Sequence, residues 1–115
     1  MRRLLRILLI GIFNLDLHDM KIRLTDIVTE TYSNSAGHQL YVELKKSVSQ
    51  DSPVELSFLG ATPTSSSFLN SSFGVMIEEV GLEKFKALIK PVDISSSQAS
   101  MLKHFISTFN PGVIA

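Results

Sequence analysis

Apolar and polar residues change their spacing within residues 54–81, and this change predicts a strand followed by a helix. The segment from Val54 to Phe58 alternates apolar with polar residues, which is typical of a strand with one buried face. After Gly60 and Pro63 the apolar residues recur at helical spacing. They are Leu69, Phe73, Met76, Ile77 and Val80. We expect the helix to end at Gly81, a residue that tolerates the left-handed conformation just past a helix end.

The remainder of the chain repeats this alternation of strand and helix. We expect strands at 21–28 and 87–92, helices at 38–49 and from 93–97 onward, a loop at 29–37, and a helical turn or connector at 82–86. Pro91 lacks an amide donor and favours a sheet edge, and Asn110-Pro111-Gly112 is expected to stop the last helix. The alternation favours a small, mostly parallel or mixed sheet with right-handed crossovers. The expected fold class is therefore α/β, a single domain with helices packed on the sheet.

Composition narrows the classes of function. The 115 residues suit one domain with a single core. The 11 basic and 11 acidic residues cancel, which argues against nucleic-acid binding, because that binding needs a basic face. The chain has no cysteine, which excludes disulfides and Cys-ligated zinc and is compatible with a cytoplasmic location. The 3 histidines lack metal-ligand spacing and there is no GxSxG motif, so we expect no metal, no cofactor and no enzymatic activity.

The first 19 residues have a basic and apolar pattern of their own. Arg2 and Arg3 precede a mostly apolar run from Leu4 to Leu15 that Arg6 interrupts. The run is too short to span a membrane, and the acidic residues that follow it do not suit a signal-peptide cleavage site. We interpret 1–19 as an extension, either an amphipathic surface helix or a segment upstream of a true start at Met20.

Hydroxyl groups gather where the long helix is expected to begin. The six residues of this segment are Thr64, Ser65, Ser66, Ser67, Phe68 and Leu69. A hydroxyl in such a place can accept a hydrogen bond from the free N–H groups of the first turn. The serines therefore either cap the helix and do nothing else, or also form a regulated contact surface. Phe68 lies one position off the apolar stripe, so it is either an exposed aromatic anchor or a side chain buried by a wide apolar face.

The segment from Pro53 to Gly81 resembles the STAS-like domain family, relatives of the STAS domains of anti-sigma-factor antagonists. The resemblance rests on a strand that ends in a small turn, followed by a serine run and then by Phe-Leu and Phe-Gly on the helix. These residues are Ser65, Ser66, Ser67, Phe68, Leu69, Phe73 and Gly74. In element order the resemblance covers Met20 to Phe109, and we expect a STAS-like domain over 20–112. The family implies an α/β domain that acts by binding a partner rather than by catalysis.

In the antagonists the matching turn reads Asp-Ser-Ser-Gly-Leu, and a partner kinase phosphorylates its first serine. The resemblance therefore places Ser66 at the phosphoacceptor position, with Ser67 beside it and Leu69 at the helical leucine. Ser65 stands where the antagonists have Asp, and Phe68 stands where they have Gly. Without that carboxylate, this chain lacks a group that would orient the switch.

The sequence thus predicts a small regulatory protein-interaction module with a partner surface built from Thr64 to Leu69. By resemblance, the partner is a histidine-kinase-like ATPase or another regulator. One alternative is a membrane-associated or structural accessory domain that uses residues 1–19. A weaker third hypothesis is an enzyme with a nucleophilic serine in the same turn.

Overall fold

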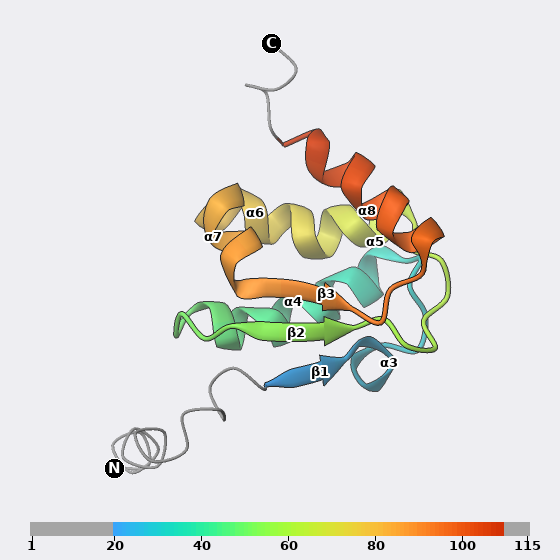
Figure 1. Ribbon diagram of the computed structural model, residues 1–115, viewed down its shortest axis with the longest axis horizontal. Helices are drawn as coiled ribbons and strands as arrows, with labels where there is room; N and C mark the ends of the chain where they lie inside the picture. The colour runs from blue at the N-terminus through green and yellow to red at the C-terminus, as the bar shows by residue number, and fades with distance from the viewer. Residues whose placement is uncertain (1–19, 110–115) are drawn as a thin grey trace.

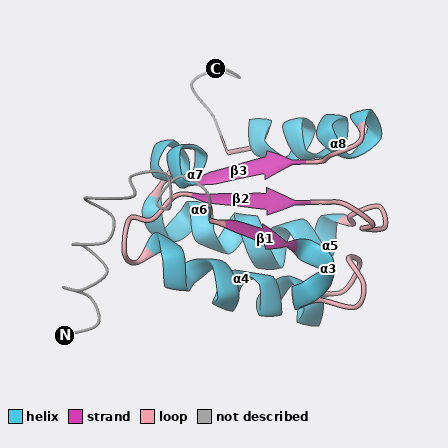
Figure 2. Ribbon diagram, turned by 60° about the horizontal axis from the view of Figure 1, so that its bottom comes forward, coloured by secondary structure: helices cyan, strands magenta, loops and turns pink. Residues whose placement is uncertain are grey.

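Three short strands lie side by side at the centre of the structure, in the order β1-β2-β3 (Figures 1 and 2). The structure is a computed structural model, and it describes residues 20–109. The strands are β1 (Lys21–Arg23), β2 (Val54–Ser57) and β3 (Ile89–Val92). Both pairings are parallel, so each connection runs from one end of the sheet back to the other. The mostly parallel α/β fold expected from the sequence is confirmed.

Helices fill the connections between the strands, and one more helix follows the last strand. They are α3 (Leu24–Ile27), α4 (Asn34–Val48), α5 (Ser66–Leu69), α6 (Val75–Val80), α7 (Leu82–Leu88) and α8 (Ser96–Ser107). A π-helical segment, η1 (Asn70–Gly74), lies between α5 and α6. The backbone stays helical at both joints, so α5, η1 and α6 form one continuous helix, the central helix (Ser66–Val80).

The first strand is shorter than its sequence predicts. Expected over 21–28, it ends at Arg23, where the chain turns into α3. Leu24 and Val28, four positions apart, are both buried, whereas Asp26 between them is exposed. That spacing belongs to a helical turn and not to a strand, which would bury alternate residues. The prediction of a strand through Val28 is therefore wrong.

The first long helix begins earlier than predicted. It starts at Asn34 and not at His38, so the expected loop over 29–37 is shorter. Ser33 explains the earlier start, because its hydroxyl oxygen accepts a hydrogen bond from the Ala36 N–H at 3.1 Å. Such a cap satisfies one of the N–H groups left free in the first turn of a helix.

The C-terminal half differs from its prediction mainly at the boundaries. The segment 82–86, expected as a helical turn or connector, is helical and belongs to the longer helix α7, so β3 begins at Ile89 and not at 87. Gly81 has a positive φ of 92°, as expected, but its ψ of 154° places it outside the left-handed helical region. The last helix, α8, begins at Ser96 behind a capping box between Ser95 and Gln98. Its expected stop at 110–112 lies outside the described residues.

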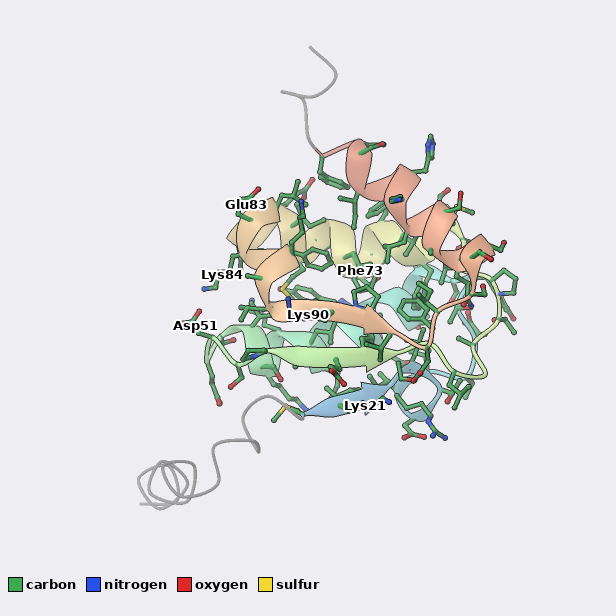
Figure 3. All side chains as sticks on the ribbon, in the orientation of Figure 1. Lys21, Asp51, Phe73, Glu83, Lys84 and Lys90 are labelled. Atoms are coloured by element: carbon green, nitrogen blue, oxygen red, sulfur yellow. The ribbon has the colours of Figure 1, made fainter. Side chains whose placement is uncertain are left out.

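The hydrophobic core lies between one face of the sheet and the helices behind it (Figure 1). Val54 and Leu56 of β2 and Phe58 just after it are buried in this core, as their alternation predicts. Figure 3 shows Phe73 of the central helix in this interior, and its ring centre lies 5.2 Å from that of Phe85 on α7. The sheet therefore has one apolar side, which α4 and the central helix cover.

The other face of the sheet carries charged side chains, and among the described residues no helix lies over it (Figures 1 and 3). Lys21, Glu55 and Lys90 form one row across the three strands. Asp93, just beyond β3, accepts a hydrogen bond from the Ser57 hydroxyl at 2.6 Å and pairs with Lys21 at 3.2 Å. These two contacts lower the pKa of Asp93. Parallel sheets are usually buried on both faces, so in this domain the polar residues make an open face tolerable.

Two helices come into very close contact at Gly37 of α4. A Cβ atom at this position would lie 2.6 Å from the Phe68 carbonyl oxygen and 2.7 Å from Ser71 Cβ, both on the central helix. These distances are shorter than van der Waals contact, and one of the two atoms belongs to the backbone. Only glycine lets the two helices pack this closely.

Gly37→Ala is expected to lower the free energy of unfolding by about 2 kcal/mol, because the added methyl group forces the helices apart. Gly74→Ala is the matched control. Its Cβ would lie 3.4 Å from Phe105 Cζ, in ordinary contact, and alanine favours helix over glycine by about 1 kcal/mol. We expect Gly74→Ala to be neutral or stabilising. Urea unfolding measures both, and equal losses of stability in the two variants would contradict the close-contact explanation.

Candidate functional site at the start of the central helix

Ser65 fixes the start of the central helix. Its hydroxyl oxygen accepts a hydrogen bond from the Phe68 N–H at 3.1 Å, and the hydroxyl donates to the Tyr32 carbonyl oxygen at 2.7 Å. The Ser65 N–H also donates to the Thr31 carbonyl oxygen at 3.1 Å. Ser65 therefore caps the helix and ties it to the loop before α4. An aspartate can cap a helix in the same way, so the serine at this position preserves the helix start while removing the charge.

Thr31 is a part of this corner that the sequence did not single out. Its hydroxyl oxygen lies 2.8 Å from the Thr62 carbonyl oxygen and 3.0 Å from that of Pro63. The side chain is almost fully buried, with 2% of its surface exposed. Thr31 lies in a stretch of polar loop residues with no periodic pattern, so only the structure shows that it joins two loops.

Three of the six residues predicted to bind a partner are directed inward. Thr64, Phe68 and Leu69 are buried, with 5%, 0% and 1% of their surface exposed. The interpretation of Phe68 as an exposed aromatic anchor is therefore wrong. Ser66 and Ser67 are exposed and remain accessible to a partner or a modifying enzyme.

The π-helical segment explains why Phe68 is buried. A π turn holds one more residue than an α turn, so residues before η1 are rotated by about 100° relative to an unbroken α-helix. The rotation brings Phe68 onto the apolar face that Phe73 and Met76 occupy. Ser72, inside the segment, is fully buried and donates its hydroxyl hydrogen to the Phe68 carbonyl oxygen at 2.7 Å.

Ser66 borders a groove between α5 and α8 of about 240 Å³, called the α5–α8 groove. The groove is lined by Ser66, Leu69, Asn70, Met101, His104, Phe105 and Thr108. Met101 is 41% exposed, so the groove offers an apolar contact next to a hydroxyl. Ser67 does not line the groove. The structure thus separates the two exposed serines and assigns Met101 and His104, which the sequence did not indicate, to the same surface as Ser66.

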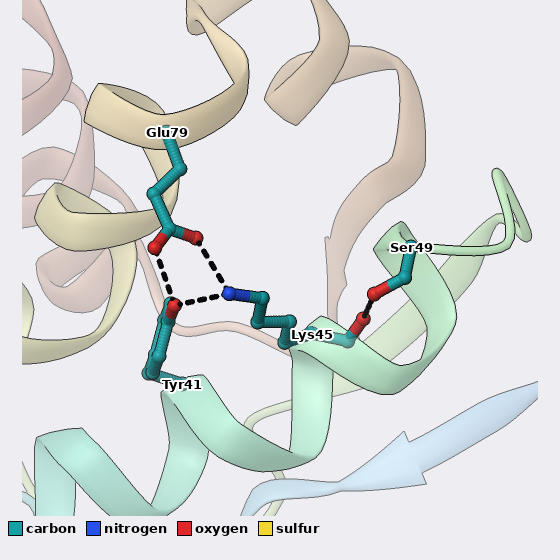
Figure 4. Close-up of polar contacts among 4 residues, drawn as sticks. All are labelled: Tyr41, Lys45, Ser49 and Glu79. Carbon is teal, nitrogen blue, oxygen red and sulfur yellow. Dashed lines mark hydrogen bonds and ion pairs between the residues drawn. The ribbon is translucent and has the colours of Figure 1, made fainter.

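A polar cluster joins the far end of the central helix to α4 (Figure 4). The Tyr41 hydroxyl donates to Glu79 at 2.6 Å, and Lys45 donates to the same hydroxyl at 3.0 Å. Lys45 and Glu79 also form an ion pair at 3.4 Å. The hydrogen bond from Tyr41 is the main cause that lowers the pKa of Glu79, and the hydrogen bond to Tyr41 is the main cause that raises the pKa of Lys45. The cluster therefore connects the two helices by charge-assisted hydrogen bonds.

Tyr41→Phe is expected to raise the pKa of Glu79 toward the ordinary value of 4.5. A carboxyl group whose pKa is lowered by folding adds stability above its unfolded pKa, and that contribution disappears as the pH falls through the lowered value. The variant should therefore lose less stability on acidification than wild type. Carboxyl carbon NMR titration of Glu79 measures the shift. Tyr32→Phe, which alters the other tyrosine of the chain, is the control, and an equal shift in both variants would contradict the assignment.

The expectations that concern residues 1–19 lie outside the described residues. Within residues 20–109, no helix is long and apolar enough to cross a membrane. In the same part of the chain, no group of three His, Asp or Glu side chains is placed to hold a metal ion.

The fold and the capped helix start define a small α/β domain whose parallel sheet is covered by helices on one face. The chain belongs to the family described as STAS-like domain of unknown function (DUF4325), whose family model matches residues 36–99, more than half of the chain. The match begins in α4 and ends in α8, so it contains the whole central helix. The resemblance noted in the sequence is thereby confirmed. No curated protein and no solved structure matches the chain.

Proposed function

We propose that this domain is a cytoplasmic regulatory module that binds a protein partner through the α5–α8 groove and does not catalyse a reaction. The observation that carries the proposal is the exposed Ser66 at the edge of a groove with apolar residues. Met101 supplies an accessible apolar side chain there. A partly exposed apolar contact surrounded by polar groups is typical of a protein-binding surface.

Phosphorylation of Ser66 would control this contact. Ser66 is the first residue of the central helix, where free N–H groups and the positive end of the helix dipole favour a negative charge. A phosphate carries a charge of about −2, and His104 on the facing helix lies along the same groove. The same charge next to Met101 would weaken an apolar partner contact, because the phosphate would have to be desolvated.

The residues that depart from the antagonists' turn fit this proposal. Ser65 keeps the helix start in place through its two hydrogen bonds. Phe68 is a core residue, so its size does not obstruct the exposed serines. By family resemblance, the partner would be a histidine-kinase-like ATPase or another regulatory protein.

The test is a comparison of tagged full-length wild type, Ser66→Glu and Ser67→Glu purified from the native cells. We expect the recovery of a partner with Ser66→Glu to be about tenfold lower than with wild type, because the substitution places a charge in the apolar contact. Ser67→Glu, which adds the same charge outside the groove, should retain it. Quantitative mass spectrometry of the co-purified proteins measures the recovery, and peptide mapping of wild type locates any phosphoserine.

Binding of the same partner should also depend on the apolar residues of the groove. Met101→Glu is expected to reduce its recovery as Ser66→Glu does, because both place a carboxylate in the groove. Equal recovery by wild type, Ser66→Glu and Met101→Glu would contradict the proposal. Phosphate found on Ser67 and not on Ser66 would contradict the assigned phosphoacceptor.

A further inference from the structure

The two edges of the sheet differ in their capacity to accept another strand. In β3, the Val92 carbonyl oxygen accepts a hydrogen bond from the Phe58 N–H at 3.0 Å, so the backbone N–H and C=O groups of Val92 face β2. The backbone N–H and C=O groups of successive residues in a parallel strand face opposite edges. The backbone N and C=O of Pro91 therefore face the outer edge of the sheet, away from β2. Proline has no N–H to donate, and its ring blocks a further strand. The β3 edge is therefore closed.

The β1 edge is open by the same reasoning. The Met20 carbonyl oxygen accepts a hydrogen bond from the Glu55 N–H at 2.9 Å. The backbone N–H and C=O groups of Met20 and Ile22 therefore face β2. The N–H and C=O groups of Lys21 are then directed outward. Within residues 20–109, no strand pairs with this side of β1. Unpaired backbone groups of this kind are the attachment points for an added strand.

A groove of about 650 Å³ runs beside the open edge, between β1, α3 and α4, and is called the β1-edge groove. Its apolar residues are Ile22, Ile27 and Val42. Val42 is 44% exposed, one of the few large apolar side chains with so much free surface among the described residues. A side chain directed toward the helices from a strand added at this edge would enter this groove.

The opposite face of β1 is basic. Lys21 and Arg23 alternate with Ile22 and are exposed on the open face of the sheet. Lys21 pairs with Asp93, and Arg23, which has no ion pair among the described residues, lies near enough to help lower the pKa of the same carboxyl group. Lys21 and Arg23 also line the edge of the groove, and acidic Asp26 and Glu43 lie on its helical walls. On the open face, the two side chains nearest the free edge of the sheet are therefore basic.

We propose that the β1 edge binds an extended acidic segment of a partner protein by strand addition. Apolar residues at alternate positions of that segment fill the β1-edge groove, and acidic residues between them lie beside Lys21 and Arg23. A second copy fits less well, because antiparallel pairing about Ile22 sets Lys21 opposite Arg23 of the other copy, and like charges directly opposite each other repel. The proposal does not depend on the α5–α8 groove, which shares no lining residue with this one.

The probe is a fluorescein-labelled peptide in which glutamate and valine alternate over six residues, titrated with the full chain and followed by fluorescence anisotropy. We expect saturable binding that Val42→Asp and Arg23→Glu each weaken by about tenfold, through loss of the apolar contact and of charge complementarity. Lys90→Glu is the matched control, since Lys90 lies on the same face but on the closed edge. It should change the affinity by no more than about twofold. A lysine–valine peptide should bind Arg23→Glu better than wild type.

Three results would overturn the proposal. The first is absence of saturable binding, and the second is equal binding of a peptide with the same composition arranged as three valines followed by three glutamates. The third is protection of the Lys21 amide from hydrogen exchange in the free full chain, since this would show that another part of the chain or a second copy already pairs with the edge. Rapid exchange that slows when the alternating peptide is added supports strand addition.

Discussion

The contact between Gly37 and the Phe68 carbonyl oxygen sets the spacing of the two helices that cover the sheet. Because α4 and the central helix meet there without an intervening side chain, the loops that precede them also come together. Thr31 then contacts Thr62, and Ser71 donates a hydrogen bond to Asn34 at 2.8 Å. The accessible serines occupy their position because this close packing holds the corner in place. A change in helix spacing would therefore affect the core and the proposed binding surface together.

Much of the fold follows from the spacing of apolar residues. The strand β2 and the alternation of strands with helices are visible as changes of period between two and about 3.6. Boundaries are less predictable where one residue serves two roles. The loop expected over 29–37 ends at Gly37, and glycine usually disfavours helix interiors. Gly37 nevertheless lies inside α4, where a contact with a residue 31 positions away in the chain requires it. Local sequence contains no information about such a contact.

The site was predictable only in its location. A run of hydroxyls before an apolar stripe indicated where the helix begins, and Ser65 is indeed its cap. The burial of Phe68 depends on a π turn, which changes hydrogen bonding without an obvious signal in residue type. The facing residues Met101 and His104 come from α8, some 35 positions later, and are placed by tertiary packing. The helix start could therefore be inferred, whereas the surface opposite it could not.

The two proposed binding surfaces are carried by different elements. The α5–α8 groove belongs to helices, and the β1-edge groove to a strand and the outer side of α4. Modification at Ser66 would change the first surface by adding charge, whereas the second depends on backbone pairing and on Arg23. The two proposals therefore place two partners on separate elements, and only the first partner would respond to modification of Ser66.

The segment Asn70–Gly74 also bears on how such domains diverge. A homologue with one residue fewer in this segment would regain regular α-helical winding there, and everything between the cap and the deletion would turn by about 100°. Phe68 would then move toward solvent, and the side chain at position 66 would face away from α8. The contact of α4 with Phe68 and Ser71 would have to readjust, whereas the strand pairings involve other parts of the chain. Gain or loss of a single residue is thus a route by which evolution can exchange the recognition surface of the domain while its scaffold is retained.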